Sequence, residues 1–95
     1  MKKLNIIAVC GFGVGSSMVL KMKIEEILKE ANIAANVQTA DVGSASSTPA
    51  DIIFTSNELG DKLSASVDVP VVIINNFVDK NEIREKGLPE VEKLL

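Results

Sequence analysis

The sequence predicts an α/β fold, in which a four-stranded parallel sheet is covered by helices on both faces. Short apolar runs alternate with amphipathic stretches along the chain, which is typical of parallel strands joined by helices. The chain also has no Trp or Tyr and only three Phe, so that Val, Ile, Leu and Ala must fill its core. These residues are the usual core of a parallel sheet that is buried on both sides.

Composition excludes several classes of function. The net charge is −3 and the basic residues are scattered, so the chain lacks the basic surface with which proteins bind nucleic acid. No apolar stretch approaches the ~18 residues of a transmembrane helix, and we expect no direct insertion into a membrane. A single cysteine, Cys10, permits no internal disulfide and fits a reducing, cytoplasmic compartment. We expect residues 1–95 to form one domain, without a metal or a cofactor.

The first predicted elements are a strand and a helix. Leu4–Val9 is an almost continuous apolar run, which predicts a buried strand. Met18–Ala31 has the spacing of an amphipathic helix, with Ser16 or Ser17 as its N-cap and Asn32 at its end. The predicted buried face of this helix consists of Val14, Met18, Met22, Ile24, Ile27, Leu28 and Ala31.

The rest of the chain continues the alternation. The next predicted elements are the strand Val37–Val42, the polar loop Gly43–Pro49, the strand Ile52–Phe54, and a helix through about Ser64 that Ser56 or Asn57 caps. The last ones are the strand Val71–Ile74, a turn at Asn75-Asn76, a helix from Asp79 to about Lys86, and a short helix at Glu90–Leu95. Gly87 is expected to end the former helix, and Pro89 suits the first turn of the latter.

This order of elements predicts the strand order 2-1-3-4, which is that of a small flavodoxin-like three-layer sandwich. In such sheets the ligand lies past the carboxyl ends of the strands, where the strand order reverses. Here that point falls between the first and third strands, beside the loops Cys10–Ser17 and Thr55–Asn57. Polar residues near the strand ends fit ligand contacts and capping equally well; they are Asp41, Ser56, Asn57, Asn75 and Asn76.

The segment Cys10-Gly11-Phe12-Gly13-Val14-Gly15-Ser16-Ser17 predicts a phosphate-binding loop. A glycine-rich turn between a strand and a helix directs backbone N–H groups to one spot, and the helix dipole adds positive partial charge there. The same helix end is expected to lower the pKa of the Cys10 thiol, which makes a thiolate available near neutral pH. Phe12 fits partner docking or core packing, and the serine hydroxyls fit capping or phosphate contact.

Two familiar phosphate-binding loops do not fit this segment. A dinucleotide fingerprint needs a third glycine where Ser16 stands, and Asp41 lies 30 residues after Gly11, beyond the usual spacing of ~20. A Walker A loop needs Gly-Lys followed by Ser or Thr, and the segment contains no lysine.

A thiol phosphatase is a third alternative, but its loop carries an arginine where Ser16 stands. Its leaving group also needs an acid, and the sequence places neither Asp41 nor Asp61 for that role. The only arginine, Arg84, lies far along the chain, and there is no histidine. A thiolate in an anion site without arginine holds a phosphoryl group but promotes its hydrolysis poorly. This combination favours a phosphoryl carrier.

The segment from Val9 to Met18, followed by Lys21-Met22-Lys23, resembles the IIB component of a bacterial phosphoenolpyruvate-dependent sugar phosphotransferase system, ascorbate type, which is related to the galactitol and lactose types. The Ala50–Ile53 strand entry and the Asn75-Asn76 turn are compatible with the same family. The resemblance implies that a phosphohistidine on a separate IIA partner phosphorylates Cys10. It also implies a phosphate site at Gly11–Ser17.

The resemblance further implies that the phosphocysteine transfers its phosphoryl group to a sugar, L-ascorbate by this likeness, which the membrane IIC partner binds. The absence of histidine agrees, because a histidine-free chain cannot be the IIA component. Two alternatives remain open from the sequence: a small cysteine-dependent phosphatase, and a regulatory module that senses phosphate at the same loop.

Overall fold

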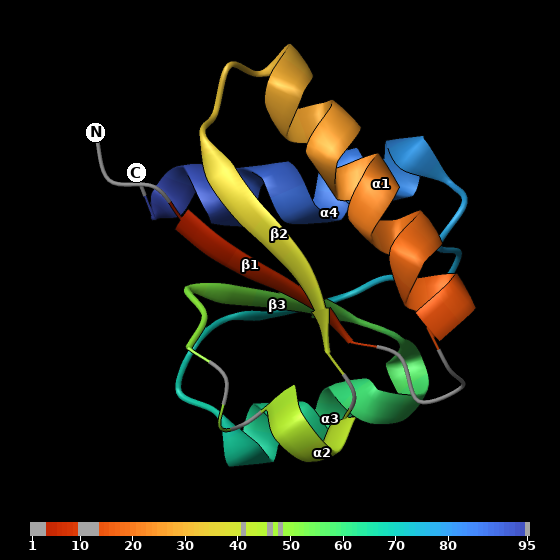
Figure 1. The fold of residues 1–95 in the computed structure, drawn as a ribbon, viewed down its shortest axis with the longest axis vertical. Helices are drawn as coiled ribbons and strands as arrows, with labels where there is room; N and C mark the ends of the chain where they lie inside the picture. Colours follow the sequence, from red (N-terminus) through yellow and green to blue (C-terminus); the bar gives the residue numbers. More distant parts are fainter. Residues whose placement is uncertain (1–3, 10–13, 41, 46, 48, 95) are drawn as a thin grey trace.

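A computed structural model describes residues 4–9, 14–40, 42–45, 47 and 49–94 of the chain. Within these residues, strands and helices alternate from end to end (Figure 1). The elements are β1 Leu4–Val9, α1 Val14–Glu30, β2 Ala35–Ala40, α2 Val42–Ala45, β3 Ile52–Thr55, α3 Asn57–Ser66, β4 Val71–Ile73 and α4 Lys80–Lys93. Among the described helices, none combines the length and the apolar content needed to cross a bilayer.

The sheet is parallel and has the strand order β2-β1-β3-β4, as the sequence predicts. β1 pairs with β2 along its full length, from Leu4 opposite Ala35 to Val9 opposite Ala40. In Figure 1, α1 and α4 lie on one side of the sheet, and α2 and α3 lie on the other. The structure is therefore the predicted flavodoxin-like three-layer sandwich.

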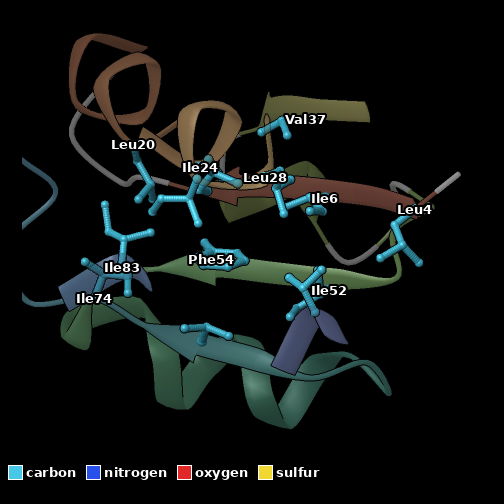
Figure 2. Packing of buried hydrophobic residues seen from close by; sticks show 14 residues of the cluster. Leu4, Ile6, Leu20, Ile24, Leu28, Val37, Ile52, Phe54, Ile74 and Ile83 are labelled. Atoms are coloured by element: carbon cyan, nitrogen blue, oxygen red, sulfur yellow. The ribbon is translucent and has the colours of Figure 1, made fainter. Parts of the chain in front are cut away.

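The core consists of two apolar clusters, one on each face of the sheet. Successive side chains of a strand point to opposite faces, so Ile6 and Ala8 join one cluster while Ile7 and Val9 join the other. Figure 2 shows Leu20, Ile24 and Leu28 of α1 gathered near Phe54 of β3 in the first cluster. Both clusters are built mainly from aliphatic residues, as the composition predicts, and Phe54 lies in the first of them.

α1 begins four residues before the predicted start. It starts at Val14, so that Ser16 and Ser17 lie in its first turn and are not its N-caps, which corrects the prediction. Gly and Ser are weak helix formers, and the fold outweighs their local preference here. Asn32 ends the helix as expected, with the left-handed φ of 59° that suits a helix C-terminus.

The prediction that Met18 and Met22 belong to the core is wrong. Their side chains are 47% and 55% exposed. Ala31, also predicted to be buried, is exposed as well. The buried stripe contains the predicted Ile24, Ile27 and Leu28 together with Leu20, at the i, i+4, i+7, i+8 spacing of a single helix face. A helix with apolar residues on two faces can bury only the one that meets the sheet, and the sequence pattern did not distinguish the two.

The segment after α1 differs from the predicted boundaries because strand pairing decides them. β2 begins at Ala35 and ends at Ala40, two residues earlier than predicted, in register with the whole of β1. The short helix α2 then replaces the first part of the predicted loop. Val42, Gly43 and Ser44 are weak helix formers, but Ala45 is buried beside Ile7 and Val9 in the second cluster. Asp41 lies outside the described residues.

α3 and α4 are both longer than predicted. α3 has Ser56 as its N-cap and continues to Ser66. α4 runs unbroken from Lys80 to Lys93, so the predicted stop at Gly87 and the separate last helix are wrong. Asp79 caps α4 as predicted, because its carboxylate accepts hydrogen bonds from the backbone N–H groups of Asn81 and Glu82 at 3.1 and 3.2 Å.

Candidate functional site

The predicted site lies where the strand order reverses, at the carboxyl ends of β1 and β3. β1 ends at Val9 and α1 begins at Val14, so the connection between them is Cys10–Gly13. These four residues, Phe12 among them, lie outside the described part of the chain.

The first turn of α1 contains the other four residues of the predicted loop, Val14, Gly15, Ser16 and Ser17. The first four N–H groups of an α-helix have no acceptor within the helix, and they carry the positive end of its dipole. The first turn of α1 also has no acidic residue. The helix start at Val14 therefore leaves the N–H groups of Val14, Gly15 and Ser16 available to an anion beside the loop.

Thr55, the last residue of β3, lies beside the predicted site and makes a contact that the sequence did not reveal. Its side chain is fully buried, and its hydroxyl donates a 3.1 Å hydrogen bond to the carbonyl oxygen of Val9. The available signal was a hydroxyl residue directly after the apolar run Ile52–Phe54. The partner lies 46 residues away, and local pattern carries no information on such a contact.

A hydrogen bond between side chains joins the loop that follows β3 to the loop that follows β4. The side-chain amide of Asn57 donates a hydrogen bond to the side-chain oxygen of Asn75. Ser56 precedes Asn57 at the start of α3, and its carbonyl oxygen accepts from the N–H of Gly60 at 2.9 Å. The two loops beside the site thus form one connected polar edge of the sheet.

Glu82 of α4 holds the loop after β4, and no pattern in the sequence singles it out. Its carboxylate accepts hydrogen bonds from the backbone N–H groups of Asn75 and Asn76, at 2.7 and 3.0 Å. Lys86 pairs with the same carboxylate at 2.7 Å. The Lys86 hydrogen bond, followed by that from Asn75, holds the pKa of the Glu82 carboxyl below its usual value.

We predict that Glu82→Gln destabilises the protein by about 1–3 kcal/mol near neutral pH, because two backbone donors lose a charged acceptor. The pKa of Glu82 is lower in the folded state, so its contribution is present above the unfolded pKa of about 4.3 and is lost as the pH falls through the folded value. Urea unfolding at several pH values measures this. Glu85→Gln, with the same change in charge at an exposed site of α4, is the control. An equal effect of both variants, or no dependence on pH, would contradict the prediction.

The only arginine of the chain lies away from the predicted site. The Arg84 guanidinium donates to Glu30 at 2.5 Å, and the Lys80 ammonium pairs with the same carboxylate at 2.6 Å. Glu30 is the last residue of α1, about 24 Å from Val14 at 1.5 Å per residue. Lys80, ahead of Arg84, holds the pKa of Glu30 below its usual value. Arg84 therefore joins α4 to the far end of α1.

The described residues also bear on metal chemistry. Within residues 4–9, 14–40, 42–45, 47 and 49–94, no three His, Cys, Asp or Glu side chains are grouped to hold a metal ion. The chemistry available from the described residues is anion binding by backbone N–H groups at the start of α1, next to a connection that carries the only thiol of the chain.

Comparison with known proteins gives consistent matches over most of the chain. Residues 5–87 match the family model described as "PTS system, Lactose/Cellobiose specific IIB subunit". The ascorbate-specific PTS system EIIB component of Mycoplasma pneumoniae is 37% identical over 86 residues, which cover 88% of this chain and 90% of that protein. The component of the same name from Salmonella typhimurium is 34% identical over 91 residues, covering 94% and 90%.

The fold agrees with a solved structure from the same class. The lactose-specific IIB component domain of the Streptococcus pneumoniae phosphotransferase system superposes with a TM-score of 0.69, covering 98% of this chain and 95% of that one. Its sequence is 13% identical, so this likeness bears on the fold alone. The assignment of this chain to a family rests on the family model, which matches residues 5–87, and on the relatives that are more than 30% identical. The chain belongs to the IIB family of sugar phosphotransferase systems, which are phosphotransferases, and it is similar to the ascorbate-specific members.

Proposed function

We propose that Cys10 carries a phosphoryl group from a phosphohistidine on a IIA partner to a sugar bound by a membrane IIC partner. IIB components in general work with IIA and IIC partners. The relatives are named ascorbate-specific, and ascorbate is the sugar we propose here. The protein would act at the cytoplasmic side of the membrane, associated with it through IIC.

One observation carries the proposal. The only cysteine directly follows β1 at the point where the strand order reverses, and α1 begins four residues later. The free N–H groups at the start of α1, on Val14, Gly15 and Ser16, are suited to the phosphoryl oxygens, together with Ser17 of the same turn and Gly11, Phe12 and Gly13 of the connection. The helix N-terminus also favours the thiolate form of the cysteine.

Each transfer is a substitution at phosphorus. In the first, the Sγ thiolate of Cys10 attacks the phosphorus, the P–S bond forms, and the P–N bond breaks as the imidazole leaves as a neutral ring, with a proton supplied from outside this chain. In the second, a sugar hydroxyl oxygen attacks, the P–O bond forms, and the thiolate leaves as the P–S bond breaks. The hydroxyl proton passes to a base outside this chain. Backbone N–H groups stabilise the charge on the phosphoryl oxygens in both steps.

The position of Arg84 supports transfer in preference to hydrolysis. A thiol phosphatase stabilises its transition state with an arginine in the loop, at the position of Ser16 in this chain. The only arginine here is instead paired with Glu30 at the opposite end of α1. A phosphocysteine in this setting has hydrogen-bond donors but lacks that positive charge, which suits an intermediate that must outlast the encounter between two partners.

Labelling tests the proposal directly. The chain is incubated with a IIA protein that carries radioactive phosphate on histidine, and the product is treated with iodine, which cleaves phosphate from sulfur. We expect iodine-labile label on the peptide that contains Cys10, and its transfer to ascorbate when membranes containing the IIC partner are added. Label that persists in Cys10→Ala would overturn the proposal. Steady hydrolysis of an aryl phosphate that requires Cys10 would favour the phosphatase instead.

A further inference from the structure

Thr55 connects three strands at the edge of the sheet where the predicted loop starts. Its hydroxyl donates to the carbonyl oxygen of Val9 on β1, at 3.1 Å. Its own carbonyl oxygen accepts from the N–H of Ile74, directly after β4, at 2.8 Å. The side chain is 0% exposed, so water does not compete for the hydroxyl. The end of β1 is thus held by β3 through a side chain, and β3 in turn by β4.

This hydrogen bond lies just beyond the regular pairing of β1 and β3. Their residue pairs run from Ile6 opposite Ile52 to Ala8 opposite Phe54. The Thr55 hydroxyl therefore extends the connection between the two strands by one residue, to Val9. The acceptor on Val9 belongs to the peptide group whose nitrogen is that of Cys10. Since a peptide group is planar, a hydrogen bond to its oxygen also restrains its nitrogen and the direction in which the chain continues.

We infer that Thr55 is a positioning residue for the Cys10 nucleophile: its hydroxyl fixes the Val9–Cys10 peptide, and thereby the place of the thiolate relative to the N-terminus of α1. The inference rests on the proposed role of Cys10. In this role Thr55 acts through the backbone, by way of the Val9 carbonyl oxygen that its hydroxyl contacts. The physical reason is that N–H donors stabilise a thiolate only when it is aligned with them. Small displacements in a reacting site also lower the rate of the reaction.

A structural role alone would give the same hydrogen bond, since a buried hydroxyl needs an acceptor. The two roles differ in what they predict for Cys10. If Thr55 serves only to satisfy its own hydroxyl, its loss lowers stability and leaves the reactivity of the thiol unchanged. If it positions Cys10, loss of the hydroxyl raises the pKa of the thiol toward the usual value and slows phosphoryl transfer, even where the protein stays folded.

The experiment compares Thr55→Val and Thr55→Ala, which lack the hydroxyl, with Thr55→Ser, which keeps it. Ile52→Val is the matched control: it shortens another fully buried side chain of β3, at the far end of the strand. For each folded variant, the rate of alkylation by iodoacetamide is measured against pH. Because Cys10 is the only cysteine, this rate reports on that thiol alone. Phosphorylation by phospho-IIA is measured in parallel, as kcat and KM.

We expect the Val and Ala variants to shift the alkylation profile to higher pH and to lower kcat about tenfold with KM nearly unchanged. The Ser variant should stay within about threefold of the parent protein, and Ile52→Val should match the parent in both measurements. Parent-like alkylation profiles in Thr55→Val or Thr55→Ala overturn the inference, and either variant decides it if the other fails to fold. If no phosphoryl group reaches Cys10 in the parent protein, the proposed function fails, whereas the alkylation profiles still decide the role of Thr55.

Discussion

Replacing Cys10 by serine is expected to lower the rate of phosphoryl acceptance from phospho-IIA by at least about 10³-fold. A serine hydroxyl is un-ionised near neutral pH and needs a base to become a nucleophile. The chain has no histidine to act as that base, so the loss should be as complete as in Cys10→Ala. A factor of 10³ corresponds to about 4 kcal/mol of transition-state stabilisation. Initial rates with a quantified phospho-IIA donor measure it.

The parent protein offers a control without any mutation. Alkylation of its single thiol should abolish acceptance in proportion to the fraction modified, while phosphate on the thiol should protect it from alkylation. We expect the serine variant to keep a cooperative unfolding transition, because the two apolar clusters are built by the strands and helices. Acceptance by Cys10→Ser at more than about a hundredth of the parent rate would mean that the phosphoryl group goes elsewhere.

The second large effect concerns stability and the glycine in the middle of α4. A Cβ built on Gly87 would lie well inside van der Waals contact with Cε2 and Cζ of Phe54. Phe54 is itself buried at the centre of its cluster and has little room to move (Figure 2). Glycine is therefore needed here for the close approach of α4 to the sheet. It does not end the helix, although a glycine in that position of a sequence commonly does so.

We predict that Gly87→Ala destabilises the protein by about 1–2 kcal/mol and Gly87→Val by about 3 kcal/mol or more. In an exposed helix, glycine to alanine would stabilise by about 1 kcal/mol. Overpacking of a closed core costs about 1–3 kcal/mol or more, and it outweighs that gain. Urea unfolding measures the difference. Glu85→Ala, at an exposed site two residues earlier, should change stability by no more than about 0.5 kcal/mol.

A double-mutant cycle makes this prediction specific to Phe54. Phe54→Leu removes ring atoms that the new methyl group would meet, so the cost of Gly87→Ala should fall in that background, with a coupling energy of about 1 kcal/mol. Phe54→Leu alone will destabilise, and the cycle subtracts that effect. Stabilisation by Gly87→Ala in the parent protein would show that α4 can move off the sheet at no cost, which contradicts the close contact described here.

The elements of the candidate site were predictable to different degrees. Leu4–Val9 was predicted with the correct ends because a buried central strand is a continuous apolar run between polar residues. The cap at Asp79 was predictable from local side-chain chemistry, whereas Ser56 stands at the predicted N-cap position without a side-chain capping hydrogen bond. The start of α1 was not, since glycine and serine are weak helix formers and the fold places them in the helix nonetheless. The role of Cys10–Gly13 remains a prediction, because those residues lie outside the described part of the chain.

The sequence by itself determined the parallel sheet and its strand order, together with the position of the only thiol directly after the first strand. These features depend on patterns that repeat within a few residues, and parallel connections have few alternatives. Tertiary structure alone decided that Met18 and Met22 are exposed, that α4 continues past Gly87, and that Thr55 holds Val9. Each of these depends on contacts between residues far apart in the chain, where packing outweighs local preference.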